Sequence, residues 1–142
     1  MPTSASRRPV LVDTSVAVAL VLADHDHHDA THEALGTRRL GLAGHAAFET
    51  FSVLTRMPAP ARRTPASVSR LLTTSFPHGR FITPQASAAL LTQLPKLGIA
   101  GGAVFDALVG ATAREHGLTL VTRDRRALDT YRALDVAVEL LD

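Results

Sequence analysis

The sequence of 142 residues has no cysteine, no tryptophan, one tyrosine and a single lysine, Lys96. Without cysteine there is neither a disulfide framework nor a thiolate metal site, which fits a cytoplasmic protein. Because only 4% of the residues are aromatic, the core must consist mainly of leucine, valine and alanine. The length and the 46% share of hydrophobic residues predict one globular domain over residues 1–142.

Long apolar runs are absent too. The apolar stretch 16–22 is too short to cross a bilayer, and no secretion signal precedes Asp13, so we expect no membrane association. Residues 1–8 have the character of a basic N-terminal tail. The net charge is only +2, but nearly all the basic residues are arginines, whose planar guanidinium groups suit phosphate. A nucleic-acid partner is therefore compatible with the composition, although this charge alone does not establish one.

The organising segment is the short run Val10, Leu11 and Val12, which ends on Asp13. An uninterrupted apolar run of this kind is typical of a parallel strand buried on both faces. Open α/β sheets bind their ligands at the carboxyl ends of such strands. Asp13 has two interpretations at this point, because it can also cap the helix predicted over residues 16–22.

Strands and helices alternate along the rest of the chain. Further strands are predicted at 40–43, 81–82, 118–121 and 136–141. Further helices are predicted at 30–35, 45–57, 66–75, 85–94, 104–116 and 125–134. This order predicts an α/β fold, a single three-layer domain whose central, mostly parallel sheet is flanked by helices. In the helix over 45–57, Phe48, Phe51 and Leu54 are predicted to supply the apolar face that packs on the core, with Val53 as a further candidate.

Three more acids are predicted at the same edge of the sheet as Asp13. Asp124 follows the buried strand 118–121, and Asp106 lies in the first turn of the helix before that strand. Glu49 lies one turn into the helix that follows strand 40–43. In βαβ units the carboxyl ends of strands and the amino ends of helices meet at one edge, so these acids can share a cleft.

Four carboxylates in one cleft repel one another and require protons or cations. Oxygen ligands without cysteine favour Mg²⁺ or Mn²⁺, and such a site suits phosphodiester cleavage because it activates water and stabilises charge. Three hydroxyl residues are candidates to support a ligand or metal-bound water: Thr14, Ser15 and Thr122. Three arginines around a proline-rich connection are candidates to contact a phosphate backbone: Arg56, Arg62 and Arg63.

The segments that carry the four acids resemble the acidic motifs of PIN-domain nucleases. They are residues 10–15 (VLVDTS), 48–50 (FET), 105–109 (FDALV) and 120–124 (LVTRD). The resemblance extends from about residue 9 to residue 141, and with the segment 131–134 (YRAL) before the last strand it is greatest to the VapC toxins of bacterial toxin–antitoxin pairs. It implies a Mg²⁺- or Mn²⁺-dependent endoribonuclease that blocks translation, a homodimer and a small antitoxin partner.

The resemblance also implies individual roles. Asp13, Glu49 and Asp106 would be the principal metal ligands, and Asp124 would bind metal directly or through water. Thr122 would support the first aspartate. Some members of the family have a further acid after the fourth motif; Asp129 is the candidate here, and a surface position on a helix is the favoured interpretation of it.

Several alternatives stay open. A receiver-like phosphoacceptor domain also has an aspartate at a strand end, although it needs a second acid near the first strand and a lysine late in the chain. A catalytically silent PIN-like domain would bind only RNA or a partner. The cluster of histidines and aspartates at 24–29 is better interpreted as a polar helix start than as a metal site. Three other histidines are predicted to be structural or solvent-facing: His45, His78 and His116.

Overall fold

The computed structural model describes residues 8–142. Four short strands form one sheet: β1 (Val10–Val12), β2 (Leu40–Leu42), β3 (Leu120–Thr122) and β4 (Val138–Leu140). Their order is β2-β1-β3-β4, and each neighbouring pair is parallel. The two central strands, β1 and β3, are buried along their whole length, which agrees with the apolar runs Val10–Val12 and Leu120–Val121; Thr122 ends β3 and is also buried.

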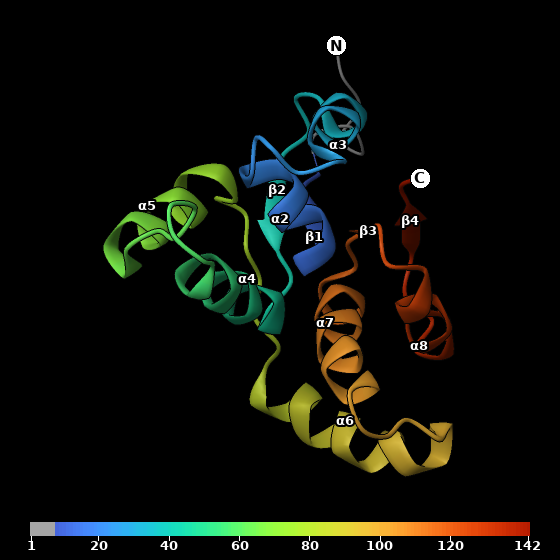
Figure 1. The fold of residues 1–142 in the computed structure, drawn as a ribbon. Coiled ribbons are helices and arrows are strands. Elements are labelled where there is room, and N and C mark those ends of the chain that lie inside the picture. The colour runs from blue at the N-terminus through green and yellow to red at the C-terminus, as the bar shows by residue number, and fades with distance from the viewer. Residues whose placement is uncertain (1–7) are drawn as a thin grey trace.

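Helices flank this sheet. They are α2 (Thr14–Val21), α3 (His28–Leu35), α4 (His45–Arg56), α5 (Pro65–Ser75), α6 (Pro84–Leu97), α7 (Ala103–His116) and α8 (Leu128–Ala133), with a 3₁₀ turn, η1 (Arg125–Ala127), before α8. In Figure 1, α4 and α5 lie on one side of the molecule and α8 with β4 on the other, with α7 between them. The predicted α/β fold with a parallel sheet flanked by helices is confirmed.

The register of the sheet sets the position of the acids. Val12 pairs with Leu42 on one side and with Val121 on the other, and the backbone N–H of Asp13 donates to the Val121 carbonyl at 3.3 Å. Asp13 follows β1 directly and Thr122 is the last residue of β3, so both lie at the same carboxyl edge of two neighbouring central strands. The core lies around these strands, and the side chains of Leu11, Val12 and Leu120 are fully buried.

Tyr131 of α8 belongs to the same core, with 1% of its surface exposed. Its ring packs against α7 at Gly110, where an added Cβ would lie 3.0 Å from the ring. Even an alanine methyl group here would require the Tyr131 ring to shift by a few tenths of an ångström. Gly110 thus allows the close approach that brings Tyr131 under the carboxyl edge of the sheet.

The prediction of a strand at 81–82 is wrong. The segment before it makes isolated bridges, Pro77 with Gly41 of β2 and Arg80 with Ala43 just after β2. The backbone N–H groups of His78 and Arg80 donate to the carbonyls of Leu40 and Leu42 at 3.0 and 3.1 Å, so the chain has already paired with this edge when it reaches residue 81. A Cβ on Gly41 would lie 2.0 Å from the His78 carbonyl oxygen, so this crossing requires glycine in β2.

The prediction that Phe48 faces inward is also wrong. The buried positions of α4 are Ala46, Thr50 and Leu54, which recur every four residues. Phe48 lies two residues from the first two of these and therefore points away from the core, with 65% of its surface exposed. Its ring lies 6.2 Å from that of Phe81, which is also exposed.

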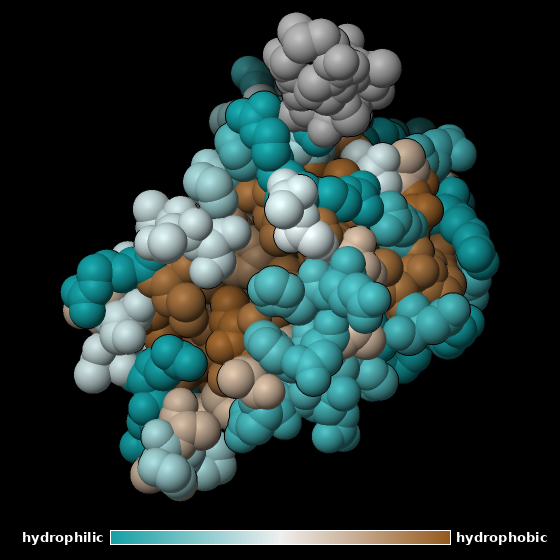
Figure 2. All heavy atoms as spheres, turned by 90° about the horizontal axis from the view of Figure 1, so that it is seen from above, coloured by the Kyte–Doolittle hydropathy of each residue, from teal (hydrophilic) through white to brown (hydrophobic). Residues whose placement is uncertain are grey.

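The surface combines hydrophilic and apolar areas. The face in Figure 2 exposes hydrophobic residues in patches between hydrophilic ones. Among residues 8–142, no helix has the length and the apolar character needed to span a membrane. Residues 1–7 of the predicted basic tail lie outside the described residues, while Arg8 donates a hydrogen bond to the Gly117 carbonyl at 2.6 Å.

Candidate active site

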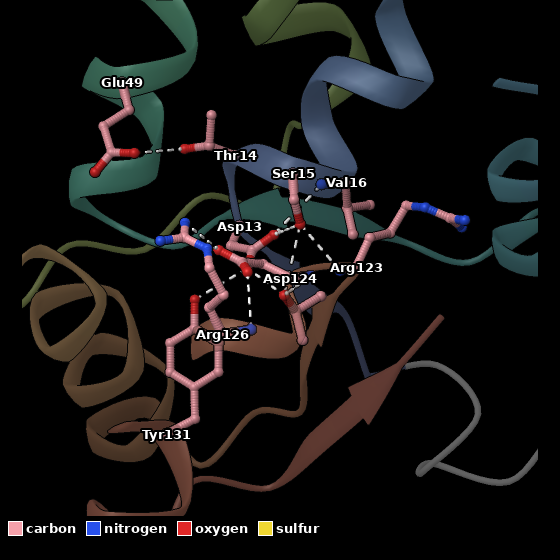
Figure 3. Close-up of polar contacts among 10 residues, drawn as sticks. Asp13, Thr14, Ser15, Val16, Glu49, Arg123, Asp124, Arg126 and Tyr131 are labelled. Carbon is pink, nitrogen blue, oxygen red and sulfur yellow. Dashed lines mark hydrogen bonds and ion pairs between the residues drawn. The ribbon is translucent and has the colours of Figure 1, made fainter. Parts of the chain in front are cut away.

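Asp13 is the most enclosed of the predicted acids, with 4% of its surface exposed. It caps α2 by accepting a hydrogen bond from the backbone N–H of Val16 at 3.3 Å, so the cap interpretation is confirmed. The same oxygen accepts from Ser15 Oγ at 2.5 Å. The other carboxylate oxygen accepts from Thr122 Oγ1 at 2.5 Å and from the Tyr131 hydroxyl at 2.9 Å (Figure 3).

Burial is the dominant influence on this carboxyl group. It raises the pKa of Asp13 above its ordinary value, and the donors from Ser15, Thr122 and Tyr131 offset part of that rise. Burial and the negative charge of Asp13 raise the pKa of Tyr131 far above its usual range, so the phenol keeps its proton. The Tyr131 hydroxyl therefore acts as a permanent donor that fixes one oxygen of Asp13.

The three predicted hydroxyl residues all contact predicted acids. Thr14 Oγ1 donates to Glu49 Oε2 at 3.1 Å, which connects α2 to α4. Thr122 Oγ1 also accepts from the backbone N–H of Asp124 at 3.0 Å and so connects Asp124 to Asp13. The bonds from Ser15 to Asp13 and from Asp124 to Thr122 are local to the turns after β1 and β3, whereas those from Thr14 to Glu49 and from Thr122 to Asp13 join residues 35 and 109 positions apart.

The structure brings all four acids to one small cavity of about 50 Å³, lined by Asp13, Glu49, Asp106 and Asp124 together with Thr14, Ser15, Val109 and Tyr131. Asp106 lies in the first turn of α7 and is half-buried. Burial raises the pKa of Asp106, and the negative charges of Asp124, Glu49 and Asp13 raise it further, while Arg126 opposes them. The acids are thus close enough to repel one another, as their predicted convergence requires.

The chemistry of this set fits a hard divalent cation. Four carboxylates and no sulfur or obligatory nitrogen form the donor set that Mg²⁺ and Mn²⁺ prefer. Within residues 8–142, however, no three histidine, aspartate or glutamate side chains are already arranged as metal ligands. The carboxylates of Asp13, Glu49 and Asp124 are instead held by hydrogen-bond donors, such as Arg126 on Asp124 at 3.2 Å and Thr14 on Glu49. Some of these side chains must turn for a cation to bind.

The cluster at 24–29 behaves as the predicted helix start. Helix α3 begins at His28 and has Asp29 in its first turn, where the helix dipole favours an acid. The His28 ring forms a 2.9 Å hydrogen bond with the Ala19 carbonyl. Asp129 is exposed on α8 and does not line the acidic cavity, as predicted for a surface residue.

The predicted phosphate-binding arginines do not line the acidic cavity. Arg56 is exposed at the end of α4, and the Arg62 guanidinium donates to the Met57 carbonyl at 2.8 Å. Arg63 is partly buried, and its Nε has no hydrogen-bond partner among the described residues. A role in binding RNA stays a prediction for all three.

Three contacts of the acids were missed at the sequence level. They involve Tyr131 on Asp13, Arg126 on Asp124 and His45 on Glu49. His45 Nε2 lies 3.1 Å from Glu49 Oε1, and the histidine ring stacks on Phe105 with the ring centres 5.0 Å apart. The spacing of four residues between His45 and Glu49 was an available signal, because such pairs face each other on a helix.

Comparison with known proteins agrees with this geometry. Residues 10–133 match the PIN domain family, which is most of the chain. The chain belongs to the PIN-domain family. It is 43% identical over 130 residues to Ribonuclease VapC27 of Mycobacterium tuberculosis, with 92% of this chain and 95% of that protein covered. It is 44% identical over 131 residues to Ribonuclease VapC40 of the same organism, covering 91% of this chain and 96% of that protein.

A solved structure has the same fold as this PIN domain. The crystal structure of VapBC2 from Rickettsia felis, bound to a DNA fragment from its promoter, matches with a TM-score of 0.69 at 16% identity. The match covers 95% of this chain and all of that one. Together with the two VapC relatives, the PIN family assignment makes this a VapC-type PIN domain and excludes the receiver-like alternative.

Proposed function

We propose that this VapC-type PIN domain is a Mg²⁺- or Mn²⁺-dependent endoribonuclease and the toxin of a toxin–antitoxin pair, which inhibits translation by cutting RNA. The observation that carries the proposal is the meeting of Asp13, Glu49, Asp106 and Asp124 in one cavity. The names of the relatives VapC27 and VapC40 include ribonuclease, and both are aligned over nearly their whole length. The proposal places this activity in the cytoplasm.

In this proposal Asp13, Glu49 and Asp106 hold the cation, and Asp124 binds it directly or through water. A bound divalent cation supplies an activated water and stabilises the charge that develops on the phosphate. The remaining side chains set the positions of the acids. Tyr131 and Thr122 fix one oxygen of Asp13, while Thr14 holds Glu49.

The proposal includes two protein partners. An antitoxin is supported by the fold shared with VapC in the VapBC2 complex of Rickettsia felis. A homodimer is supported by exposed aromatic side chains: Phe48, Phe81 and Phe105 are 65%, 61% and 49% exposed. Large apolar side chains gathered at a surface are typical of interfaces, and light scattering of the purified chain tests whether it dimerises.

The deciding experiment is cleavage of a cellular RNA pool by purified protein, with Mg²⁺ or Mn²⁺ and with EDTA. Asp106→Asn should abolish cutting because it removes one proposed ligand. Asp129→Asn is the matched control, since it changes an exposed aspartate outside the cavity, and it should cut like wild type. Folded wild-type protein that binds RNA without cutting it in any metal would favour the silent PIN-like alternative.

A further inference from the structure

A second, larger hollow of about 750 Å³ adjoins the acidic cavity. Thr14 and Ser15 line both, so the two meet at the first turn of α2. Val18, Val53 and Leu141 give the larger hollow an apolar floor. That floor suits a nucleic-acid base and a protein side chain equally, so the polar groups at the border decide which ligand fits.

Three arginines from the turn after β3 border this hollow: Arg123, Arg125 and Arg126. Arg126 turns back toward the cavity and contacts Asp124. The side chain of Arg123 points away from Asp13 in Figure 3, and its guanidinium donates to the Thr31 hydroxyl at 3.2 Å. The residues around Asp124 thus direct one carboxylate into the cavity and two guanidinium groups toward the hollow.

Arg123 and Arg125 both contact Asp142, which lies two residues after β4. Arg125 donates to the Asp142 carboxylate at 2.6 Å, and Arg123 donates to the main-chain oxygen of Asp142 at 2.6 Å. Guanidinium groups bind carboxylate and phosphate oxygens in the same way, so the Asp142 carboxylate marks where an anion fits against Arg125, with Arg123 beside it. The side chains of Arg125 and Asp142 are 71% and 87% exposed, which makes their ion pair weak and easily exchanged.

We propose that Arg123 and Arg125 form a phosphate-binding subsite for the RNA strand beside the acidic cavity, and that Asp142 occupies this subsite until RNA displaces it. The proposal rests on the proposed ribonuclease function. If the phosphodiester to be cut lies at the acids, the neighbouring phosphates of the RNA lie near Thr14 and Ser15, which line both hollows. The arginines border that path, and contacts between arginine and phosphate position a strand without reading its sequence.

The first test measures binding of a short, fluorescent, single-stranded RNA of mixed sequence in EDTA, so that binding is separated from cutting. Arg125→Ala should weaken binding about 3- to 10-fold, the effect of losing one typical hydrogen bond at a solvent-exposed position. It should also reduce the slope of log affinity against log salt by about 0.7, as expected for one lost phosphate contact. Arg132→Ala is the control, because it removes an exposed arginine of α8 that does not line the hollow.

The second test uses Asp142→Asn, which should tighten RNA binding about 2- to 5-fold. The substitution removes the charge of the exposed carboxylate that competes with RNA phosphate for Arg125. The same change in an Arg125→Ala background should have no effect, since the competition would be for Arg125. Asp135→Asn is the control for charge: it is exposed, lies outside the hollow and has a φ of 56°, which asparagine also tolerates.

Two outcomes would overturn the subsite. Arg125→Ala could bind RNA as tightly as Arg132→Ala, which would leave protein docking as the use of the hollow. Asp142→Asn could also tighten RNA binding equally with and without Arg125. If wild type still cuts RNA with Mg²⁺ in these cases, only the subsite fails; a wild type that neither binds nor cuts RNA overturns the proposed function as well.

Discussion

The hydroxyl of Tyr131 donates a hydrogen bond of 2.9 Å to Asp13 Oδ2, although the two residues are 118 positions apart in the chain. Both are buried, with 1% and 4% of their surfaces exposed. A buried carboxylate is costly unless donors satisfy it, so this bond connects the packing of α8 to the stability of the acidic cavity.

Tyr131→Phe should lower the free energy of unfolding by about 1–3 kcal/mol, because it removes a hydrogen bond to a buried charged group while keeping the ring. The decrease in the free energy of unfolding should be largest for the metal-free protein at neutral pH, because a charged, buried Asp13 depends most on its hydrogen-bond donors. Urea unfolding followed by circular dichroism measures it. An unchanged midpoint and slope would mean that the bond contributes nothing to stability.

Asp106→Asn should stabilise the metal-free protein while abolishing RNA cutting. The charges of Asp124, Glu49 and Asp13 act on Asp106, so neutralising it removes repulsion. The gain should be below about 1 kcal/mol, because Asp106 is only half-buried and water screens these interactions. Thermal unfolding in EDTA measures the effect. A functional acid is expected to lower the stability of the metal-free fold. If Asp106→Asn melts at a lower temperature than wild type, Asp106 instead stabilises the fold and this expectation is wrong.

The stability of the metal-free protein should also depend on pH in a defined direction. The pKa of both Asp13 and Asp106 is raised above the ordinary 3.8, so between 3.8 and the raised values the folded protein binds more protons than the unfolded chain. The free energy of unfolding contributed by these groups therefore falls as pH rises through that window. Subtracting the curve of Asp106→Asn from that of wild type gives the contribution of Asp106 together with its interaction with the neighbouring acids. A difference that does not change with pH would contradict the raised pKa of Asp106.

The convergence of the acids was predictable because its causes are local. Val10 to Val12 and Leu120 to Val121 are continuous apolar runs, and each is followed closely by an acid. Once both strands are parallel and central, their ends must meet at one edge. Residues near a strand end in sequence, such as Thr14 and Thr122, reach the acids for the same reason.

What escaped prediction depends on packing between distant segments. Tyr131 reaches Asp13 from α8 while its ring packs closely on Gly110 of α7, and no pattern near Tyr131 encodes that approach. The strand expected at 81–82 failed for a similar reason, since pairing with β2 is made by residues 77–80 and depends on the path of the chain across Gly41. Phe48 was misplaced because its apolar character indicated burial, whereas the fourfold spacing on α4 leaves it outside.

Added Mg²⁺ or Mn²⁺ should stabilise wild type. The metal should thereby remove the difference in stability by which metal-free wild type is predicted to fall below Asp106→Asn. A cation that binds only the folded protein stabilises it by about 2.7 kcal/mol at 100 times its dissociation constant. The acids are held by donors such as Tyr131 and Thr14, so the cation must compete with these bonds. Asp106→Asn should show a much smaller gain, because it has lost one carboxylate of the proposed set. Melting temperatures across a metal titration test this, with Ca²⁺ as a second oxygen-seeking cation. If metal raises the melting temperatures of wild type and Asp106→Asn equally, the metal binds outside the acidic cavity. That conclusion holds whatever the effect of the substitution on RNA cutting.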